Sequence, residues 1–431
     1  MTRMPSTDLN PDPAAEQPRL VVRTWRIDED VDLAAHLPAV PSGAWLQHGQ
    51  GLVALGRAWE FTSAGPDRFT AASAAFRALA ARADVVDEVL ARGSGLVALG
   101  SFSYAAASER PSTLLVPEAV LGVHDGKVFL TLVSRDEEPS APAHFTSLFP
   151  AVPAEPPLPP GRLTIEADHS PDEYQALVRE AVRAIRAGQA EKVVLSETTT
   201  VRTAEPAVPG ALLARLTAAY PSTWTYHVAD MIGASPEMLA QVQDGRLFSR
   251  VLAGTRSVAD DGELAADDRR AFLADAKERS EHTFAIDSVL ARLAGIAEVE
   301  HRSPEPFVLR LPGLEHLASD VTAQLSEGVT SLDVAARLHP SAAVSGTPRE
   351  AADEIIARLE ARDRGGYAAP VGWMDARGDG QWAIALRGGH LLGDGGVRLQ
   401  AGGGLVAASD PVSEHAEVLA KCRPMLRALR G

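Results

Sequence analysis

Residues 170–201 read SPDEYQALVREAVRAIRAGQAEKVVLSETTTV and carry the signals of one helix followed by one strand. Ser170-Pro-Asp-Glu173 is a capping box with proline at the first helical position. Apolar residues then share one helix face between positions 174 and 185, and Gly188 ends the helix. A strand is predicted over residues 192–201. This stretch therefore predicts a helix next to a strand, and the order of the later elements decides the fold class.

Further helices and strands come after it in an order that does not alternate strictly. A long helix is predicted over residues 268–296, and a last helix begins at Pro411, capped by Asp410 or Ser409. Glycine turns separate three antiparallel strands, at residues 371–375, 381–392 and 397–406. This order predicts an α+β fold, with large antiparallel or mixed sheets layered with helices.

A proline-rich stretch divides the chain. Eight prolines lie between residues 138 and 160, and proline favours an extended connector. We expect a disordered tail (1–18), an N-terminal α+β scaffold (19–137), a connector (138–162) and a C-terminal domain (163–431). In the scaffold, residues 69–91 are predicted to be helical and Asp125-Gly126 to turn a hairpin. The repeated hexamer GLVALG, at 51–56 and 95–100, predicts two similar central strands of one sheet.

Composition excludes several classes of protein. The chain has 431 residues, 45% of them apolar, with 57 acidic and 41 basic residues and a formal charge of −16. Such a charge repels a phosphate backbone, so nucleic-acid binding is not expected. The single cysteine, Cys422, excludes disulfides and cysteine metal clusters within the chain. No signal peptide or membrane-spanning run is present, which predicts a soluble, cytoplasmic protein.

Two predicted helices carry paired glutamates on one face. Glu278 and Glu281 are three residues apart, as are Glu414 and Glu417. Each pair alone is more typical of a solvated helix surface. Together, two acidic faces could close on a hard cation, because Mg²⁺ prefers oxygen ligands. The order of residues lacks the first histidine of the H-x-x-E-H motif, which disfavours zinc hydrolysis.

Other residues suit a site for a small anion. Lys192 opens an apolar strand; it is expected at the solvated strand end, but burial would make it a usable general base. Glu237 follows a glycine- and proline-shaped turn, where it could face a cleft or simply start a helix. Arg387 is predicted inside an apolar strand, which favours a carboxylate partner. Ala401-Gly-Gly-Gly404 could bring backbone amides to an anion, although it lacks the lysine and serine of a phosphate loop.

In this order these motifs resemble the chorismate-utilising enzymes, from about residue 168 to residue 427. That family includes isochorismate synthase, salicylate synthase and the chorismate-binding components of anthranilate and aminodeoxychorismate synthases. The matching blocks are Lys192-Val-Val-Leu-Ser196, Gly233-Ala-Ser-Pro-Glu237, Ala253-Gly-Thr-Arg256, Lys277-Glu-x-x-Glu-His282, His316-Leu-Ala-Ser319, Leu338-His-Pro-Ser-Ala-Ala-Val-Ser-Gly-Thr-Pro348, Ala401-Gly-Gly-Gly404 and Ser409-x-Pro-x-x-Glu414-x-x-Glu417-x-x-x-Lys421.

The resemblance implies the anthranilate synthase component I-like fold, with residues 163–431 as the chorismate-binding catalytic domain. It also implies a Mg²⁺ ion held between the two glutamate pairs. Glu281 and Glu417 would lie closest to the ion, and Glu278 and Glu414 would complete the site directly or through water. The substrate-binding residues that it implies are Gly254, Thr255, His316, Ala343, Thr347, Arg387, Gly402, Gly403 and Lys421.

Among the family's activities, the resemblance favours isochorismate synthase. The water-adding members carry a lysine at the position of Lys192, which deprotonates water, and a glutamate at the position of Glu237, which protonates the departing ring hydroxyl. Ala253 argues against the aminodeoxychorismate synthases that use a covalent lysine there, and against salicylate synthases, which usually have threonine.

Three alternatives stay open: a salicylate synthase, an aminating component I, and a catalytically silent chorismate binder. The long N-terminal part favours menaquinone over siderophore synthesis. We expect a monomer that needs no amidotransferase subunit, and no catalytic residues before residue 160.

Overall fold

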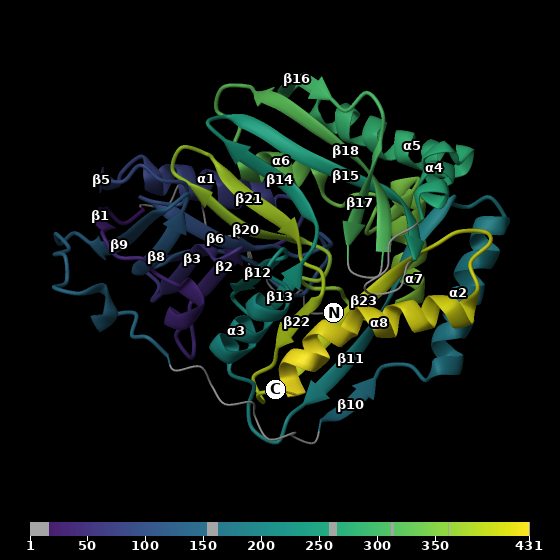
Figure 1. Ribbon diagram of the computed structural model, residues 1–431, viewed down its shortest axis with the longest axis horizontal. Helices are drawn as coiled ribbons and strands as arrows, with labels where there is room; N and C mark the ends of the chain where they lie inside the picture. The colour runs from purple at the N-terminus through teal and green to yellow at the C-terminus, as the bar shows by residue number, and fades with distance from the viewer. Residues whose placement is uncertain (1–16, 153–162, 258–264, 312–313, 361, 431) are drawn as a thin grey trace, which may run out of the picture.

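The computed structural model describes residues 17–152, 163–257, 265–311, 314–360 and 362–430 (Figure 1). The side chains of a few residues within these ranges, including Thr255 and Glu281, also lie outside the description. Nearly all of the tail predicted at 1–18, and residues 153–162 of the predicted connector, lie outside it as well.

Two large sheets form the centre of the molecule. Within the described residues the larger sheet has 13 strands, and β19 (Gly346–Thr347) pairs with its strand β11. The others run in the order β10 (Thr164–Ala167), β11 (Lys192–Arg202), β23 (Val397–Leu405), β22 (Gly388–Leu391), β13 (Met231–Ser235), β12 (Trp224–Val228), β2 (Gly43–Gln47), β3 (Gln50–Leu55), β8 (Ala119–His124), β9 (Lys127–Arg135), β1 (Leu20–Ile27) and β5 (Asp84–Asp87).

The smaller sheet has 10 strands in the part of the chain that the structure describes, and its strand β18 also pairs with β17 (Phe307–Leu311). The others run in the order β16 (Ala297–Arg302), β18 (Leu314–Leu325), β15 (Arg246–Ser257), β14 (Met238–Gln243), β21 (Gly380–Ile384), β20 (Pro370–Asp375), β6 (Val97–Ser101), β7 (Ser112–Val116) and β4 (Trp59–Ser63). Its described pairs are antiparallel, and in the larger sheet only β1 and β5 run parallel among the pairs described.

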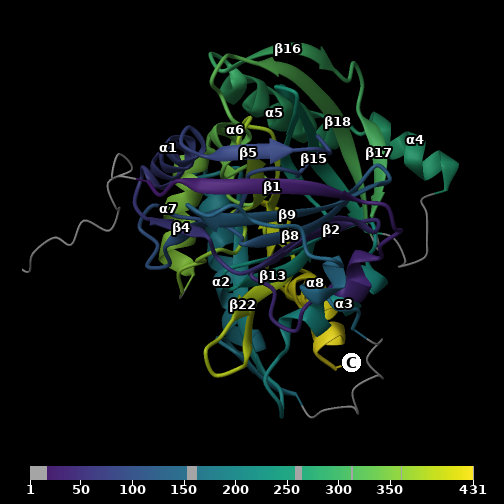
Figure 2. The same cartoon turned by 90° about the vertical axis from the view of Figure 1, so that its left-hand side faces the viewer.

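Strands from both halves of the chain share each sheet. In the larger sheet β2 pairs with β12, and in the smaller sheet β6 pairs with β20. Figure 2 shows the N-terminal strands β1, β5, β8 and β9 on the side of the molecule that faces the viewer. The residues before the connector therefore extend both sheets rather than forming sheets of their own.

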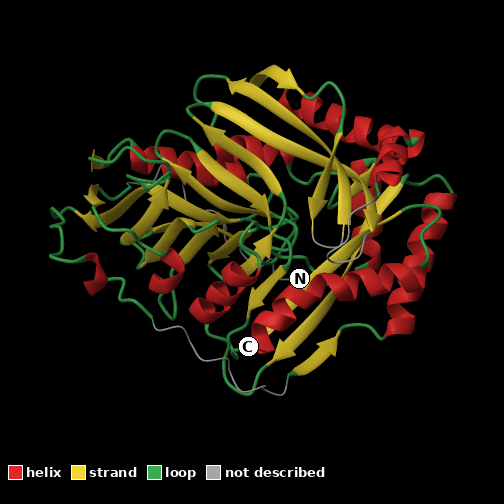
Figure 3. Cartoon of the chain, viewed as in Figure 1, coloured by secondary structure: helices red, strands yellow, loops and turns green. Residues whose placement is uncertain are grey.

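The sheets pack face to face and helices cover their outer faces (Figure 3). A cluster that includes Trp45, Leu99 and Trp373 fills the space between the sheets, and the indole of Trp45 donates to Gln381 across it at 2.9 Å. The larger sheet is covered by α2 (Pro171–Arg186), α3 (Pro209–Ala219), α7 (Arg349–Leu359) and α8 (Pro411–Arg430). The smaller sheet is covered by α1 (Arg68–Ala80), α5 (Ala276–Leu293) and α6 (Ser331–Leu338), and α4 (Ala266–Ala274) packs beside α5. Two short 3₁₀ helices are η1 (Leu33–His36) and η2 (Phe145–Ser147).

The predicted α+β fold is confirmed, and so are several of its elements. The capping box of α2 is formed on both sides. Strand β11 begins at Lys192, and Asp410 accepts a hydrogen bond from the Ser413 amide at the start of α8. The hairpin of β8 and β9 turns at Asp125-Gly126, where both residues have positive φ.

Other predicted elements are wrong. The helix over 268–296 is two helices, because Asp275 has an extended backbone and its carboxylate accepts the Glu278 amide at the start of α5. The strand over 381–392 is two strands of different sheets. The hexamers at 51–56 and 95–100 also fall in different sheets, in β3 and β6. Helix α1 ends at Ala80, and residues 84–87 pair with β1 instead.

We expect Asp230 to stabilise the fold through its contacts with Arg110 and His390. Its carboxylate accepts from Arg110 at 2.6 Å and lies 2.8 Å from His390 Nδ1. Burial alone would raise the pKa of Asp230, but the His390 hydrogen bond and the Arg110 charge outweigh it and lower the pKa. Because the side chain is 39% exposed, Asp230→Asn should cost only about 1 kcal/mol at neutral pH.

The pH dependence of this difference checks the assignment. A carboxyl with a lowered folded pKa stabilises the fold above its unfolded pKa, about 3.9, and loses that effect as pH falls through the folded value. Urea unfolding at several pH values should therefore show the difference between Asp230→Asn and the parent shrinking below about pH 4. A difference that grows on acidification would contradict this account.

Candidate active site

A cavity of about 340 Å³ lies where the two sheets meet α5 and α8. Its volume falls in the range of about 300–1,000 Å³ that is usual for small-molecule sites. The sequence-predicted residues that line it are Lys192, Glu237, Ala253, Gly254, Glu278, His316, Ala343, Arg387, Gly402, Glu414, Glu417 and Lys421. The structure thus brings together residues that are far apart along the chain, and every lining residue comes after the connector.

Strand β11 positions Lys192 at the edge of this cavity. Lys192 pairs with Thr347 of β19, and the next residue pairs with Leu405 of β23. Its aliphatic chain crosses Gly404, where an added Cβ would lie 2.8 Å from the lysine Cε. The side chain is half-buried, so the prediction of a solvated strand end is only partly met.

Glu237 lies where the chain passes from the larger sheet, in β13, to the smaller sheet, in β14. The Ser235 hydroxyl accepts a hydrogen bond from the Glu237 amide at 3.2 Å, and the Glu237 carbonyl accepts from the Ile384 amide at 3.0 Å. Desolvation raises the pKa of the Glu237 carboxyl, although the charges of Lys192, Arg387 and Lys421 partly oppose this. A carboxyl in such a place keeps a protonated fraction at higher pH than an exposed one.

Arg387 occupies the second passage between the sheets, from β21 back to β22. It has φ of 50°, so it is not inside a strand as predicted. No ion pair joins its guanidinium to a carboxylate among the residues that the structure describes. Burial lowers the pKa of Arg387, while Tyr367, Glu417 and Glu237 oppose that shift. The guanidinium is therefore left for an anionic ligand.

Lys421 and His316 complete the basic side of the cavity. The Lys421 ammonium donates to the Gly402 carbonyl at 2.8 Å and lies 2.6 Å from Glu417 Oε1. Burial lowers the pKa of Lys421, and Glu417 counters it. Burial also lowers the pKa of His316 to about 4, so this ring is neutral at pH 7.

The acidic side of the cavity contains carboxylates from two helices. An added Cβ at Gly403 would lie 3.2 Å from Glu414 Oε2 and 3.9 Å from Glu417 Oε1, so both carboxylates lie above this glycine. An added Cβ at Gly254 would likewise lie 2.9 Å from Glu278 Oε2, so this carboxylate lies above Gly254. Burial raises the pKa of Glu414; the Ser409 hydroxyl opposes this and the Glu417 charge adds to it. A bound cation would relieve this crowding.

These residues fit the expected Mg²⁺, because the side chains that converge here offer only carboxylate oxygens to a cation. As they stand, no set of three or more His, Cys, Asp or Glu side chains within the described residues is placed to hold a metal ion. The Glu281 side chain, expected closest to the ion, lies outside the description. The magnesium site thus stays a prediction.

Two further predicted residues lie just beside the cavity, and one cannot be placed. Thr347 borders an adjoining hollow of about 630 Å³. Gly403 lies in β23 opposite Leu195 and below the glutamates. The Thr255 side chain lies outside the description.

Sequence reasoning missed several lining residues, of which Tyr367 and Gln400 are polar. Burial raises the pKa of Tyr367 far above its usual value, so its hydroxyl remains a hydrogen-bond donor. Neither residue carries a charge or a glycine pattern that could have marked it. The aromatic ring at the end of Arg364-Gly-Gly-Tyr367 is the only signal in the sequence.

A buried ion pair supports one wall of the cavity. Arg364 donates twice to Glu360, at 2.6 and 2.8 Å, and both side chains are at most 5% exposed. Arg364 also donates to the carbonyls of Val194 and Val344, at 2.8 and 2.7 Å. Glu360 in turn accepts from the backbone amide and hydroxyl of Ser196, both at 2.8 Å. Since Val194 and Val344 line the cavity, this pair fixes their spacing.

The comparisons with known proteins agree with this arrangement. A family model described as "Chorismate binding enzyme" matches residues 33–430. The chain belongs to the chorismate-binding enzyme family. It is 32% identical over 355 residues (79% of this chain, 88% of the relative) to a Mycobacterium tuberculosis protein whose name gives it provisionally as the isochorismate synthase MenF. It is also 38% identical to anthranilate synthase component 1 of Streptomyces coelicolor, over 61% of this chain and 54% of that one.

A solved structure of the family has the same fold. The menaquinone-specific isochorismate synthase MenF of Escherichia coli superposes with a TM-score of 0.76 at 24% identity, over 97% of each chain. The predicted fold and the predicted family are thus both confirmed. The part of the chain that the structure describes has no helix long and apolar enough to cross a membrane.

We predict that the ion pair of Glu360 and Arg364 is essential for stability and turnover. Arg364→Gln leaves the Glu360 carboxylate buried without its partner, which should cost about 3–5 kcal/mol of unfolding free energy. Arg362→Gln is a matched control, because Arg362 is 52% exposed and pairs with Asp168 at the surface; it should cost less than about 1 kcal/mol. Urea unfolding measures both, and equal losses would refute this role of Arg364.

Proposed function

We propose that this enzyme is an isochorismate synthase, which converts chorismate to isochorismate by adding water to the ring and releasing the ring hydroxyl. One observation carries the proposal. Lys192, at the start of β11, and Glu237, in the passage between β13 and β14, line the same 340 Å³ cavity, with Arg387 and Lys421 beside them. A base, an acid and two cations in one desolvated cavity suit water addition to a small dianion.

In this mechanism Lys192 takes a proton from the attacking water. The new C–O bond forms at the ring carbon beside the carboxylate-bearing carbon. Glu237 gives its proton to the ring hydroxyl, which leaves as water while the double bonds shift. The raised pKa of Glu237 supports its role as the acid, because a fraction must be protonated near neutral pH.

The remaining charges would hold the substrate. Mg²⁺, when bound by Glu281 and Glu417 with Glu278 and Glu414 nearby, supplies Lewis-acid and orienting help at the ring carboxylate. We assign the second carboxylate to Arg387 and Lys421, with the amides near Gly402. Tyr367 adds an uncharged donor on the same wall.

The rival activities share this cavity and differ in product. Ala253 is 8% exposed and lines the cavity, so it leaves no lysine there for a covalent intermediate and no threonine hydroxyl. This supports isochorismate over aminodeoxychorismate and salicylate. The likeness to anthranilate synthase component 1 keeps amination as the alternative, and ammonia-dependent formation of anthranilate would establish it.

We place the product in menaquinone synthesis, in the cytoplasm, and expect a monomer that needs no amidotransferase subunit. The long N-terminal part, which adds strands to both sheets, is the feature that favours this choice. Growth of a menaquinone auxotroph restored by this gene would bear it out. Restoration of a siderophore auxotroph alone would point to the other pathway.

The first test of the activity is product identification. Chorismate with Mg²⁺ should give isochorismate by chromatography, with neither salicylate nor, when ammonia is supplied, anthranilate. Lys192→Ala and Glu237→Gln should each lower the rate by about 10²–10⁴-fold or more, because positioned acid and base groups contribute that much. Chorismate binding should change little. If Lys192→Ala kept most of its water-adding activity, another residue would have to be the base.

The second test concerns the metal. Glu417→Gln removes one charge above Gly403, so we expect a higher Mg²⁺ requirement and loss of turnover. Titration of Mg²⁺ by calorimetry and by rate should give the same shift. Glu180→Gln, an exposed glutamate of α2, is the matched control and should behave as the parent. Full turnover in excess chelator would exclude the metal.

A further inference from the structure

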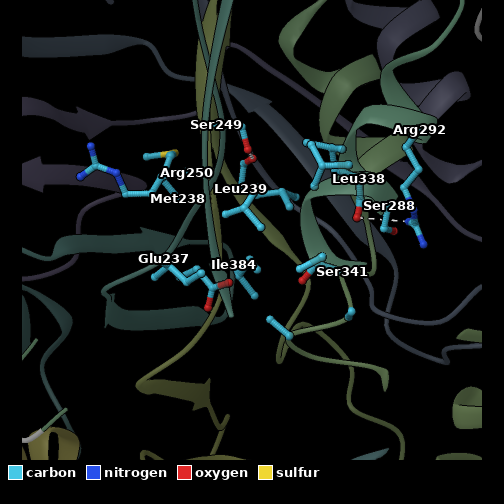
Figure 4. Close-up of a pocket in the computed structure, with 16 residues that line it drawn as sticks. Glu237, Met238, Leu239, Ser249, Arg250, Ser288, Arg292, Leu338, Ser341 and Ile384 are labelled. Atoms are coloured by element: carbon cyan, nitrogen blue, oxygen red, sulfur yellow. Dashed lines mark hydrogen bonds between the residues drawn. The ribbon is translucent and has the colours of Figure 1, made fainter. Parts of the chain in front are cut away.

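Glu237 also borders a second, smaller hollow that adjoins the chorismate cavity. This hollow measures about 50 Å³, which gives room for one or two waters at about 30 Å³ each. Figure 4 shows Glu237, Ser341, Ser288 and Arg292 arranged around it. Because Glu237 lines both spaces, this residue lies at the boundary between them.

One polar group in this hollow lacks a partner. The hydroxyl oxygen of Ser341 is fully buried and makes no hydrogen bond within the described part of the chain. Buried hydroxyls are nearly always hydrogen-bonded, either to protein or to ordered water. Most of the wall of this hollow is apolar, but the unsatisfied hydroxyl and Glu237 on it offer polar partners to a water, and the hollow has room for one.

The loop that carries Ser341 is held firmly. Arg292 of α5 donates to the carbonyls of Leu338 and Pro340, at 3.3 and 3.1 Å, and the Leu338 bond is drawn in Figure 4. The Ser341 carbonyl accepts from the amides of Val344 and Ser345, both at 3.1 Å. The backbone of Ser341 is therefore held in place between α5 and the cavity wall.

The proposed reaction leaves a proton imbalance at the end of each turnover. The attacking water gives a proton to Lys192, and the ring hydroxyl leaves with the proton of Glu237. One C–O bond forms and one breaks, so the ring product needs no further proton. The enzyme, however, is left with one proton too many on Lys192 and one too few on Glu237. Glu237 must regain a proton before it can act again.

We propose that the hollow behind Glu237 is a hydration site whose water, hydrogen-bonded to Ser341, returns the proton to Glu237 after each turnover. The hollow shares Ser288, Arg292 and Ala342 with the adjoining 630 Å³ hollow. Phe284, which borders that larger hollow, is 61% exposed, so the larger hollow reaches the surface of the molecule. Water in the two hollows can thus carry protons from solvent to Glu237, past Lys192, which also borders the larger hollow.

This inference rests on the proposed function, because it assigns Glu237 as the acid. Ser341 is accordingly a positioning residue: it holds the water, and the water meets Glu237. Two substitutions of nearly equal shape test it, since Ser341→Thr keeps the hydroxyl and Ser341→Val replaces it with a methyl group. Ser249→Ala is the control in the same hollow, because the Ser249 hydroxyl is already used by the Leu239 carbonyl, at 3.1 Å.

The first measurement does not depend on turnover. A crystal structure of the parent at a resolution that shows water should have water in the hollow, bonded to Ser341 Oγ and Glu237. Ser341→Thr should keep this water and Ser341→Val should lose it. A dry hollow in the parent overturns the inference whatever the enzyme makes.

The second measurement uses chorismate and Mg²⁺. A slower return of the proton delays only the step that restores the active free enzyme after product release. Ser341→Val should therefore lower kcat and KM together, each on the order of tenfold. Its kcat/KM should stay within about twofold, and the solvent isotope effect on kcat should rise. Ser341→Thr and Ser249→Ala should behave as the parent.

Two outcomes overturn the relay. One is equal behaviour of Ser341→Thr and Ser341→Val, and the other is a fall in kcat/KM that accompanies kcat, as a distorted cavity would give. Failure of the parent to form isochorismate is a different result: it refutes the proposed function, and with it the relay, while the water structure is judged by the crystals alone.

Discussion

The buried ion pair of Glu360 and Arg364 is the contact on which the cavity depends. A desolvated guanidinium is tolerated only where its donors are used, and here they reach Glu360 and the carbonyls of Val194 and Val344. These groups belong to the end of α7, to β11 and to the loop before β19. The pair therefore joins three segments that would otherwise meet only through apolar contacts, which set distance less strictly than hydrogen bonds do.

The N-terminal part of the chain contacts the wall of the cavity through the same ion pair. The Arg364 guanidinium lies 4.5 Å from the ring of Tyr104, a residue that follows β6. The Tyr104 carbonyl accepts from His339, just before the loop that carries Ser341. The described residues before the connector thus border none of the cavity, yet they supply the packing against which its wall is held. Their role is larger than that of an appended scaffold.

The sequence predicts the site better than it predicts the strands around it. Capping signals and glycine turns are local, so α2, the start of α8 and the Asp125-Gly126 hairpin could be read directly. Sheet membership is not local: GLVALG is equally apolar in both sheets, and only its partners distinguish β3 from β6. Tyr367 and Gln400 were missed for a similar reason, because an uncharged residue becomes part of a site only when distant segments place it there. Most of the charged residues, by contrast, could be named from the family resemblance, and the structure brings them to one cavity, while their roles stay predictions.

The position of the site follows from the two places where the chain passes between the sheets, one of which interrupts the strand predicted over 381–392. The chain leaves the larger sheet between β13 and β14 and returns to it between β21 and β22, and these two passages are hydrogen-bonded to each other through Ile384 and Arg387. At each passage the backbone leaves its sheet, and one charged side chain lines the cavity there. Glu237 occupies the first and Arg387 the second. A chain with a charge of −16 can hold a dianion at this point because the nearby cations act at short range in a desolvated space, where Coulomb interactions are strong. The excess of acidic residues at the surface acts across water and salt, and is largely screened.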